Sequence, residues 1–267
     1  MLRAELFHLF ARRRVQVLLV ILALVPTGVV LALRLSGGHG GGGDGPTFLN
    51  QVTNNGVFAS LASLTITLPV FLPLAVAIVA GDSIAGEAGL GTLRYLLVRP
   101  AGRVRLLGVK AVTIVVFCLT APFVVSIAGL IAGSIFFPVG RVTTLSGETL
   151  SIAAGALRIT GAGGLVGLSL LGLAAIGMFA STLTDIPIGA IATTLGIVIL
   201  SGVLGAIPQL SAIHPWLLTN GWLSFGDLLR SHITWTAIDK NLALQAVYIL
   251  VFGSATWARF TTKDVLA

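Results

Sequence analysis

The sequence predicts an all-α integral membrane protein with six transmembrane helices, and three observations support this class. Apolar residues make up 56% of the 267 residues and charged residues 9%, whereas about a quarter of a soluble protein is charged. The mean hydropathy is +1.03. Six long segments contain no Lys, Arg, Asp or Glu. This fraction of charged residues is too low for a protein whose surface is exposed to water. Most of the surface is therefore expected to face lipid.

The six apolar segments are long enough to cross a membrane as helices. A transmembrane helix needs about 20 mostly apolar residues, whereas a transmembrane β-strand alternates in polarity over about ten residues. The segments here are continuous and longer, which argues against a barrel. We predict a single transmembrane domain over residues 1–267, with spans at about 15–33, 56–80, 111–137, 159–183, 186–207 and 241–258.

Residues 1–14 are predicted to form a short interfacial helix ahead of the first span. Apolar residues recur there at helical spacing on one face, and basic residues supply the charged side. The apolar face is Leu2, Leu6, Leu9 and Phe10, and the basic residues are Arg3 and Arg12 to Arg14. A basic anchor without a defined helix is the alternative. A cleaved signal peptide is disfavoured, because the apolar run that follows has 19 residues and no small-residue cleavage pattern.

Prolines and glycines are expected to shape the later spans. Pro69, Pro73 and Pro122 should bend their helices, because proline lacks the N–H that continues the hydrogen-bond ladder. The fourth span contains Gly163-x-x-x-Gly167, a pattern that lets helix backbones approach closely in lipid. We expect this pattern to pack within the chain. A subunit interface whose helices slide is the alternative.

Few residues are suited to catalysis or metal binding. Cys118 is the single cysteine; it is expected to be a packing residue, and it excludes a disulfide within the chain. The four histidines match no metal-binding spacing, so neither a metal nor a cofactor is expected. The phosphate-binding motif G-x-x-x-x-G-K-[ST] is absent. Asp185 is interpreted as the N-cap of the fifth span, with a proton relay as the alternative.

Residues 208–225 join the last two spans and are uncharged. The segment is interrupted by Pro208, Pro215 and Gly221, so a regular helix is not expected. Its aromatic residues are typical of the membrane–water interface; they are Trp216, Trp222 and Phe225. A surface loop and a re-entrant segment both fit this composition.

The distribution of basic residues predicts the orientation. With a cytoplasmic N-terminus, 11 of the 16 Lys and Arg residues lie on the inside and 5 on the outside. Such an excess marks the cytoplasmic side, so both termini are predicted to be cytoplasmic. The net charge of +7 fits anionic lipid headgroups better than a nucleic acid, for which no binding motif is present.

The loop at residues 81–110 is a charged segment between the apolar second and third spans. It contains five of the sixteen basic residues. Four leucines have the spacing of one helical face; they are Leu90, Leu93, Leu96 and Leu97. Gly89 and Gly91 permit a tight turn before the helix, and Thr92 can cap its start. We predict a short helix on the cytoplasmic membrane surface. A plain loop anchored by arginines is the alternative.

This loop resembles the corresponding loop of type-2 ABC transporter permeases. The matching residues are Asp82-Ser-Ile-Ala-Gly-Glu87, Gly91-Thr-Leu-Arg-Tyr-Leu-Leu97, Arg99-Pro100 and the basic stretch from Arg103 to Lys110. A C-terminal aromatic followed by a Lys-Asp pair is also similar, here Phe260 and Lys263-Asp264. The motif covers about thirty residues, and the six-span layout with cytoplasmic ends covers the whole chain.

The resemblance implies a role without bond-making chemistry in this chain. In that family the loop forms a coupling helix that docks on a cytoplasmic nucleotide-binding ATPase. Two copies of the ATPase and a second permease chain, identical or different, complete an exporter in the prokaryotic cell membrane. Carried over to this sequence, the docking residues are Glu87, Gly91, Thr92, Leu93, Arg94, Leu96, Leu97 and Arg99. Nothing in the residues identifies the transported substrate.

Two other functions fit a multi-span protein. A lipid-phosphate-modifying enzyme would need acids and arginines gathered at one membrane depth, and Asp82, Glu87, Arg94 and Arg99 are candidates, with Arg99 and Arg103 holding a phosphate. No histidine and no second carboxylate cluster accompany them in the sequence. A structural or assembly protein without transport activity is the other alternative.

Overall fold

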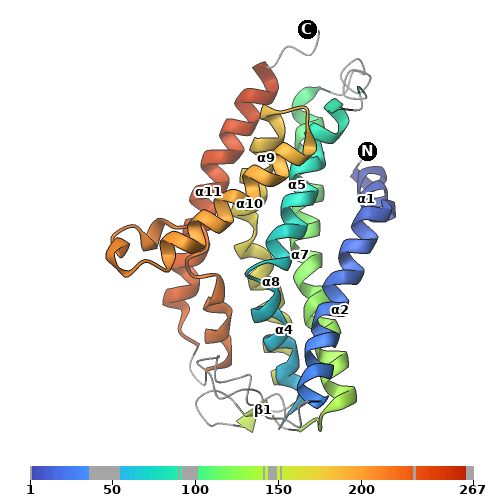
Figure 1. Cartoon of the computed structure of the whole chain (residues 1–267), viewed down its shortest axis with the longest axis vertical. Coiled ribbons are helices and arrows are strands. Elements are labelled where there is room, and N and C mark those ends of the chain that lie inside the picture. Colours follow the sequence, from blue (N-terminus) through green and yellow to red (C-terminus); the bar gives the residue numbers. More distant parts are fainter. Residues whose placement is uncertain are drawn as a thin grey trace.

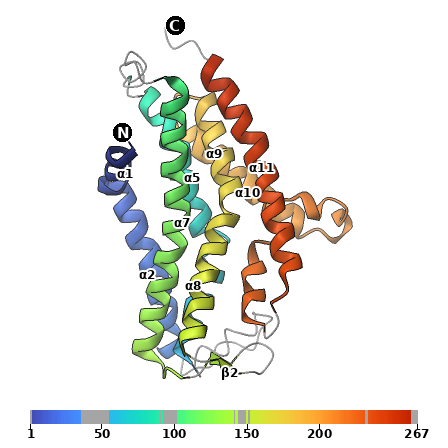
Figure 2. The ribbon, with the colours of Figure 1, turned by 180° about the vertical axis from the view of Figure 1, so that it is seen from behind.

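The computed structural model is a bundle of long helices that run roughly side by side (Figures 1 and 2). It describes residues 2–35, 55–89, 91, 102–140, 142–143, 149–150, 152–230 and 233–262. Within these residues, six helical segments are long and apolar enough to cross a membrane, as the sequence predicts. The β structure described is one pair of two-residue strands, β1 (Val142–Thr143) and β2 (Thr149–Leu150), which pair antiparallel.

The six spans are formed by seven helices, because one span is interrupted. They are α2 (Arg13–Leu35), α5 (Phe71–Gly89), α7 (Arg103–Phe136), α8 (Ile152–Ser169) with α9 (Leu171–Leu183), α10 (Pro187–Gly205) and α11 (Trp235–Thr262). Helix α9 packs against α5, α10 and α11, and α7 packs against α2 and α8. The span Leu157–Leu183 is the most buried of the six, whereas α2, α10 and α11 expose most of their apolar surface. Continuous apolar surface of this extent fits lipid or another membrane chain.

The predicted second span is divided into two helices. A 3₁₀ turn, η1 (Gly56–Phe58), leads into α4 (Ala59–Thr67), and α5 begins at Phe71. Pro69 lies in the break between them, where its missing N–H cannot continue the α4 ladder. Helix α5 does not end near residue 80 but continues to Gly89. The first part of the predicted 81–110 loop is therefore helical.

The glycine pattern of the fourth span packs inside the chain, as expected. A Cβ built on Gly167 would lie 2.8 Å from the carbonyl oxygen of Cys118 in α7, and one on Gly163 would lie 3.5 Å from the Phe123 ring. Cys118 itself is fully buried. The absence of a side chain at Gly167 is what lets α8 approach the α7 backbone.

Residues 2–11 form a helix, α1 (Leu2–Ala11), which confirms the predicted helix ahead of the first span. It lies across the direction of the long helices at one end of the bundle (Figures 1 and 2). We call this the α1 end; the last residues of α5 and α11 and the first of α7 lie there too. Leu9 and Phe10 pack against the core, while Leu2 is 39% exposed. The apolar face thus contributes to packing as well as to the surface.

The segment between α10 and α11 consists of short 3₁₀ turns rather than a span. They are η2 (Pro208–Leu210), η3 (His214–Trp216) and η4 (Trp222–Leu229). The first two project sideways from the bundle (orange, Figure 1). Trp216 is exposed, but Trp222 and Phe225 are buried in the core, so the prediction that these two face the membrane interface is wrong. They anchor the segment instead.

The interpretation of Asp185 as a helix N-cap is also wrong. The N-cap residue of α10 is Ile186, which has no side-chain cap, and Pro187 occupies the first helical position. Proline suits that position because its missing N–H would have no partner in the first turn. The backbone N–H of Ile186 donates to Thr184 Oγ1 at 3.1 Å.

Candidate functional site

The last two turns of α5 place two acidic side chains at the α1 end of the bundle. Asp82 faces the start of α2 and Glu87 faces the first turns of α7, where each contacts a basic residue. We call the five residues that these ion pairs join, Glu5, Arg12, Asp82, Glu87 and Lys110, the charged network. It joins α1, α2, α5 and α7.

Lys110 is the central member of the charged network. The residue is 3% exposed, although it belongs to the basic stretch that the sequence places in a loop. Its Nζ atom donates to Glu87 Oε1 at 2.5 Å and to Glu5 Oε1 at 3.3 Å. Removing a charge from water is costly, so a buried ammonium requires such partners. The two carboxylates therefore fix α1 and the end of α5 on α7.

The second ion pair is more exposed. Arg12 Nη1 donates to Asp82 Oδ2 at 3.2 Å, with side-chain exposures of 48% and 22%. Such pairs contribute little to stability. The Arg12–Asp82 pair instead fixes position. It connects the junction between α1 and α2 to the end of α5 that Lys110 also contacts.

A hydroxyl from α9 fixes the position of this end of α5. Ser181 Oγ donates to the Gly81 carbonyl oxygen at 2.7 Å and accepts the N–H groups of Ile84 and Ala85 at 3.0 and 2.8 Å. A side chain inserted in this way takes the place of partners within the helix. The turn of α5 that precedes Glu87 is therefore tied to the buried helix α9.

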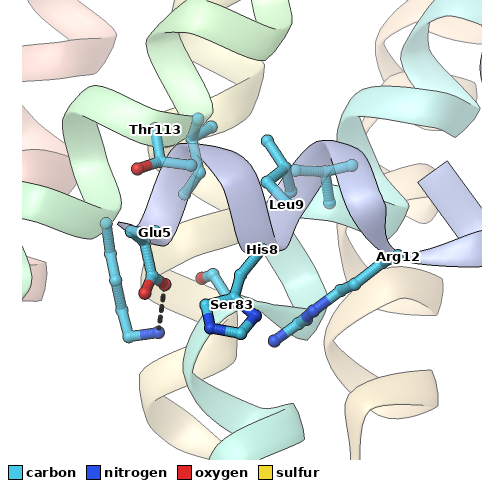
Figure 3. A pocket seen from close by; sticks show the side chains of 9 residues that line it. Glu5, His8, Leu9, Arg12, Ser83 and Thr113 are labelled. Atoms are coloured by element: carbon cyan, nitrogen blue, oxygen red, sulfur yellow. Dashed lines mark hydrogen bonds and ion pairs between the residues drawn. The ribbon is translucent and has the colours of Figure 1, made fainter. Parts of the chain in front are cut away.

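The charged network borders a small cavity. Its volume is about 30 Å³ and its lining includes Glu5, His8, Arg12, Ser83 and Lys110 (Figure 3). This space fits roughly one water molecule and is too small for a metabolite. Among the described residues, no group of three or more His, Cys, Asp or Glu side chains could hold a metal ion.

Two of the predicted docking residues, Glu87 and Gly91, lie in the part of the chain that the structure describes. Glu87 lies in α5, and Gly91 follows it in a turn with φ of +68°, whose N–H donates to the Ala88 carbonyl oxygen at 2.9 Å. Glycine adopts this left-handed backbone without strain. The other docking residues, Thr92, Leu93, Arg94, Leu96, Leu97 and Arg99, lie outside the described residues.

Four members of the charged network are absent from the sequence-based docking set, namely Glu5, Arg12, Asp82 and Lys110. Glu5 is the one acidic residue before position 44 and stands among basic residues, which is a sequence pattern that suggests a specific partner. Lys110 is predicted as part of a basic stretch, but no pattern indicates that it is buried. Lys110 pairs directly with Glu87, and Glu5 is joined to that pair through Lys110.

The fold defines a multi-pass helical membrane protein. A family model described as a protein of unknown function, DUF2705, matches residues 41–266. The chain belongs to this family. The match includes Asp82, Glu87 and Lys110 but not Glu5 or Arg12. No curated protein matches the chain.

Proposed function

We propose that this chain is the permease subunit of an ATP-binding cassette exporter, driven by a separate cytoplasmic ATPase. Two ATPase subunits and a second permease chain, identical or different, would complete the transporter in a prokaryotic cell membrane. The α1 end would face the cytoplasm. The chain itself would move substrate and hydrolyse nothing.

The buried ion pair between Glu87 and Lys110 is the observation on which this proposal depends most. The motif that resembles a coupling helix lies between these two residues in the sequence, and their pairing joins the helices on either side of it, α5 and α7. A force on the segment 90–101 would therefore act on α5 and α7 as one unit. Through Ser181 it would also reach α9, which contacts α10 and α11.

This geometry assigns different roles to the predicted docking residues. Glu87 has a side chain 14% exposed and directed at Lys110, so it would position the segment rather than contact the ATPase. The contact would be made by the residues from Gly91 onward. Nucleotide-driven closure of the ATPase dimer would then bias a rigid-element transition of the helices.

The acidic residues that a lipid-phosphate enzyme would use are engaged in ion pairs. Asp82 contacts Arg12, and Glu87 contacts Lys110. These contacts support the permease proposal over the enzyme alternative.

Site-specific photocrosslinking in cells tests the proposal. A photoreactive amino acid at Leu93 should capture a protein with nucleotide-hydrolase activity, and the purified complex should hydrolyse ATP whereas the isolated chain should not. The matched control is the same probe at Val139, which is exposed at the opposite end of the bundle. Equal capture from both positions, or no hydrolase at Leu93 in cells where transport occurs, contradicts the proposal.

A further inference from the structure

A groove lies between α11 and the segment that precedes it, away from the charged network. Its volume is about 420 Å³, and residues of both elements line it. Lys240, Leu244 and Val247 contribute from α11, and Trp216, Asn220 and Gly221 contribute from the other wall. We call it the Lys240 groove. Its volume is within the range of sites that bind small molecules.

The depth of the groove follows from the charges on α11. Lys240 and Arg259 are 19 positions apart in one continuous helix, and no Lys, Arg, Asp or Glu lies between them. At 1.5 Å per residue they are about 28 Å apart along the helix axis, close to the thickness of the hydrocarbon core. Lys240 therefore lies at the headgroup level of the leaflet opposite the α1 end.

The lining changes from polar to apolar with depth. Lys240, Ala243, Leu244 and Val247 have the spacing of one helical face and all line the groove. Val247 lies about 10 Å deeper along the axis than Lys240. The groove thus presents an exposed ammonium group and the Asn220 amide at headgroup depth, and apolar side chains and the Trp216 indole below them.

Hydrogen bonds hold the wall formed by residues 216–221 against α11. Tyr248 Oη donates to the Trp216 carbonyl oxygen at 2.8 Å, and Gln245 Nε2 donates to the Leu218 carbonyl oxygen at 3.1 Å. Asn241 Nδ2 donates to Ser169 Oγ at 2.6 Å on the inner side of the helix. The groove is therefore built before any ligand arrives, which lowers the entropy cost of binding.

We propose that the Lys240 groove binds an anionic phospholipid of the leaflet opposite the α1 end. The Lys240 ammonium would pair with the lipid phosphate, and one acyl chain would lie along Leu244 and Val247 beneath the Trp216 ring. The polarity gradient of the groove matches the order of headgroup and chain in a lipid. This proposal does not depend on the transporter assignment, since it uses neither the charged network nor the segment 90–101.

Quenching of tryptophan fluorescence by brominated phosphatidylglycerol tests the site. The difference in quenching between the intact chain and Trp216→Phe isolates the signal of Trp216. Lys240→Ala should raise the lipid concentration that gives half-maximal quenching of Trp216 about fivefold, because one basic residue near a membrane contributes about that much to affinity for anionic lipid. Lys240→Arg should retain the signal. Brominated phosphatidylcholine should quench less than phosphatidylglycerol.

Two controls separate this site from general attraction to anionic lipid. Arg34→Ala removes an exposed positive charge in the last turn of α2, and should leave the Trp216 signal unchanged. Val247→Trp, made in the Trp216→Phe chain and compared by native mass spectrometry, should fill the groove and reduce bound phosphatidylglycerol with Lys240 intact. Equal effects of Lys240→Ala and Arg34→Ala overturn the proposal. It is also overturned if a Lys240→Cys chain forms disulfide-linked dimers and the intact chain holds no lipid, because a second copy then covers the groove.

Discussion

Ser181 in α9 donates a hydrogen bond to the carbonyl oxygen of Gly81 in α5 across 2.7 Å. The absence of a side chain at Gly81 also lets α10 approach, because a Cβ there would lie 2.9 Å from the Ile191 side chain of α10. Three helices thus meet at one small residue. The end of α5 that contains Asp82 and Glu87 begins at this junction, so its direction is set by buried contacts rather than by the charges beyond it.

The first prediction concerns this junction. Ser181→Ala removes the acceptor for the N–H groups of Ile84 and Ala85, and buried N–H groups without a partner cost about 1–3 kcal/mol. The expected result is a lower midpoint of thermal unfolding in detergent. Ser254→Ala is the matched control, since its exposed hydroxyl donates within its own helix to the Val251 carbonyl oxygen. Equal midpoints for the two variants would show that the hydrogen bonds of Ser181 do not contribute to stability.

The second prediction compares the two parts of the charged network. Lys110→Met leaves Glu5 and Glu87 without their cation, and breaking a buried pair in this way costs about 3–5 kcal/mol. Arg12→Ala, at the exposed pair, should cost less than about 1 kcal/mol. Thermal unfolding of the two purified variants measures the difference. A larger loss for Arg12→Ala would mean that Lys110 is not held as the structure shows.

The third prediction separates a positioning role of Glu87 from contact with a partner. In a Glu5→Gln background the network at Lys110 reduces to a single pair with Glu87. The single change Glu87→Lys should lower stability and vesicle transport, and the exchange Glu87→Lys with Lys110→Glu should restore both. If stability returns but transport does not, Glu87 contacts the ATPase directly, as the family resemblance implies.

The sequence predicts the spans well because their evidence is additive over many residues. A segment such as 111–137 contains enough apolar residues that no single position decides the outcome, and α7 covers it as far as Phe136. The ends of the spans are less predictable. Asp82 and Glu87 suggest a loop, yet α5 continues through them, because Arg12 and Lys110 neutralise their charges from other helices.

The candidate site was predictable in location but not in composition. The motif from Asp82 to Lys110 identifies the segment and predicts Glu87 as a site residue. The pairing of Lys110 with Glu5 joins residues 105 positions apart, and no local pattern encodes such a contact. Trp222 shows the same limit, since an aromatic residue suits both the membrane interface and the core, where the structure places it.

The fourth prediction concerns the packing of α8 on α7. Gly167→Ala adds a methyl group 2.8 Å from the Cys118 carbonyl oxygen and 3.1 Å from Leu119 Cα, so the helices must separate. Overpacking of this kind typically costs about 1–3 kcal/mol. Gly202→Ala is the control, because no atom lies within 4 Å of its added Cβ. Thermal unfolding should show a loss for Gly167→Ala and little change for Gly202→Ala; equal effects would contradict the close approach.

The fifth prediction concerns the orientation of the bundle. Ala11 is exposed at the α1 end and Val139 is exposed after α7 at the opposite end. In a Cys118→Ala background, a membrane-impermeant maleimide added to intact cells should label Val139→Cys and not Ala11→Cys, because the excess of basic residues marks the α1 end as cytoplasmic. Permeabilised cells should label both, which controls for reactivity. Labelling of Ala11→Cys in intact cells would place the charged network outside the cell, where no cytoplasmic ATPase could reach it. That result would contradict the transporter proposal. It would not affect the proposal for the Lys240 groove.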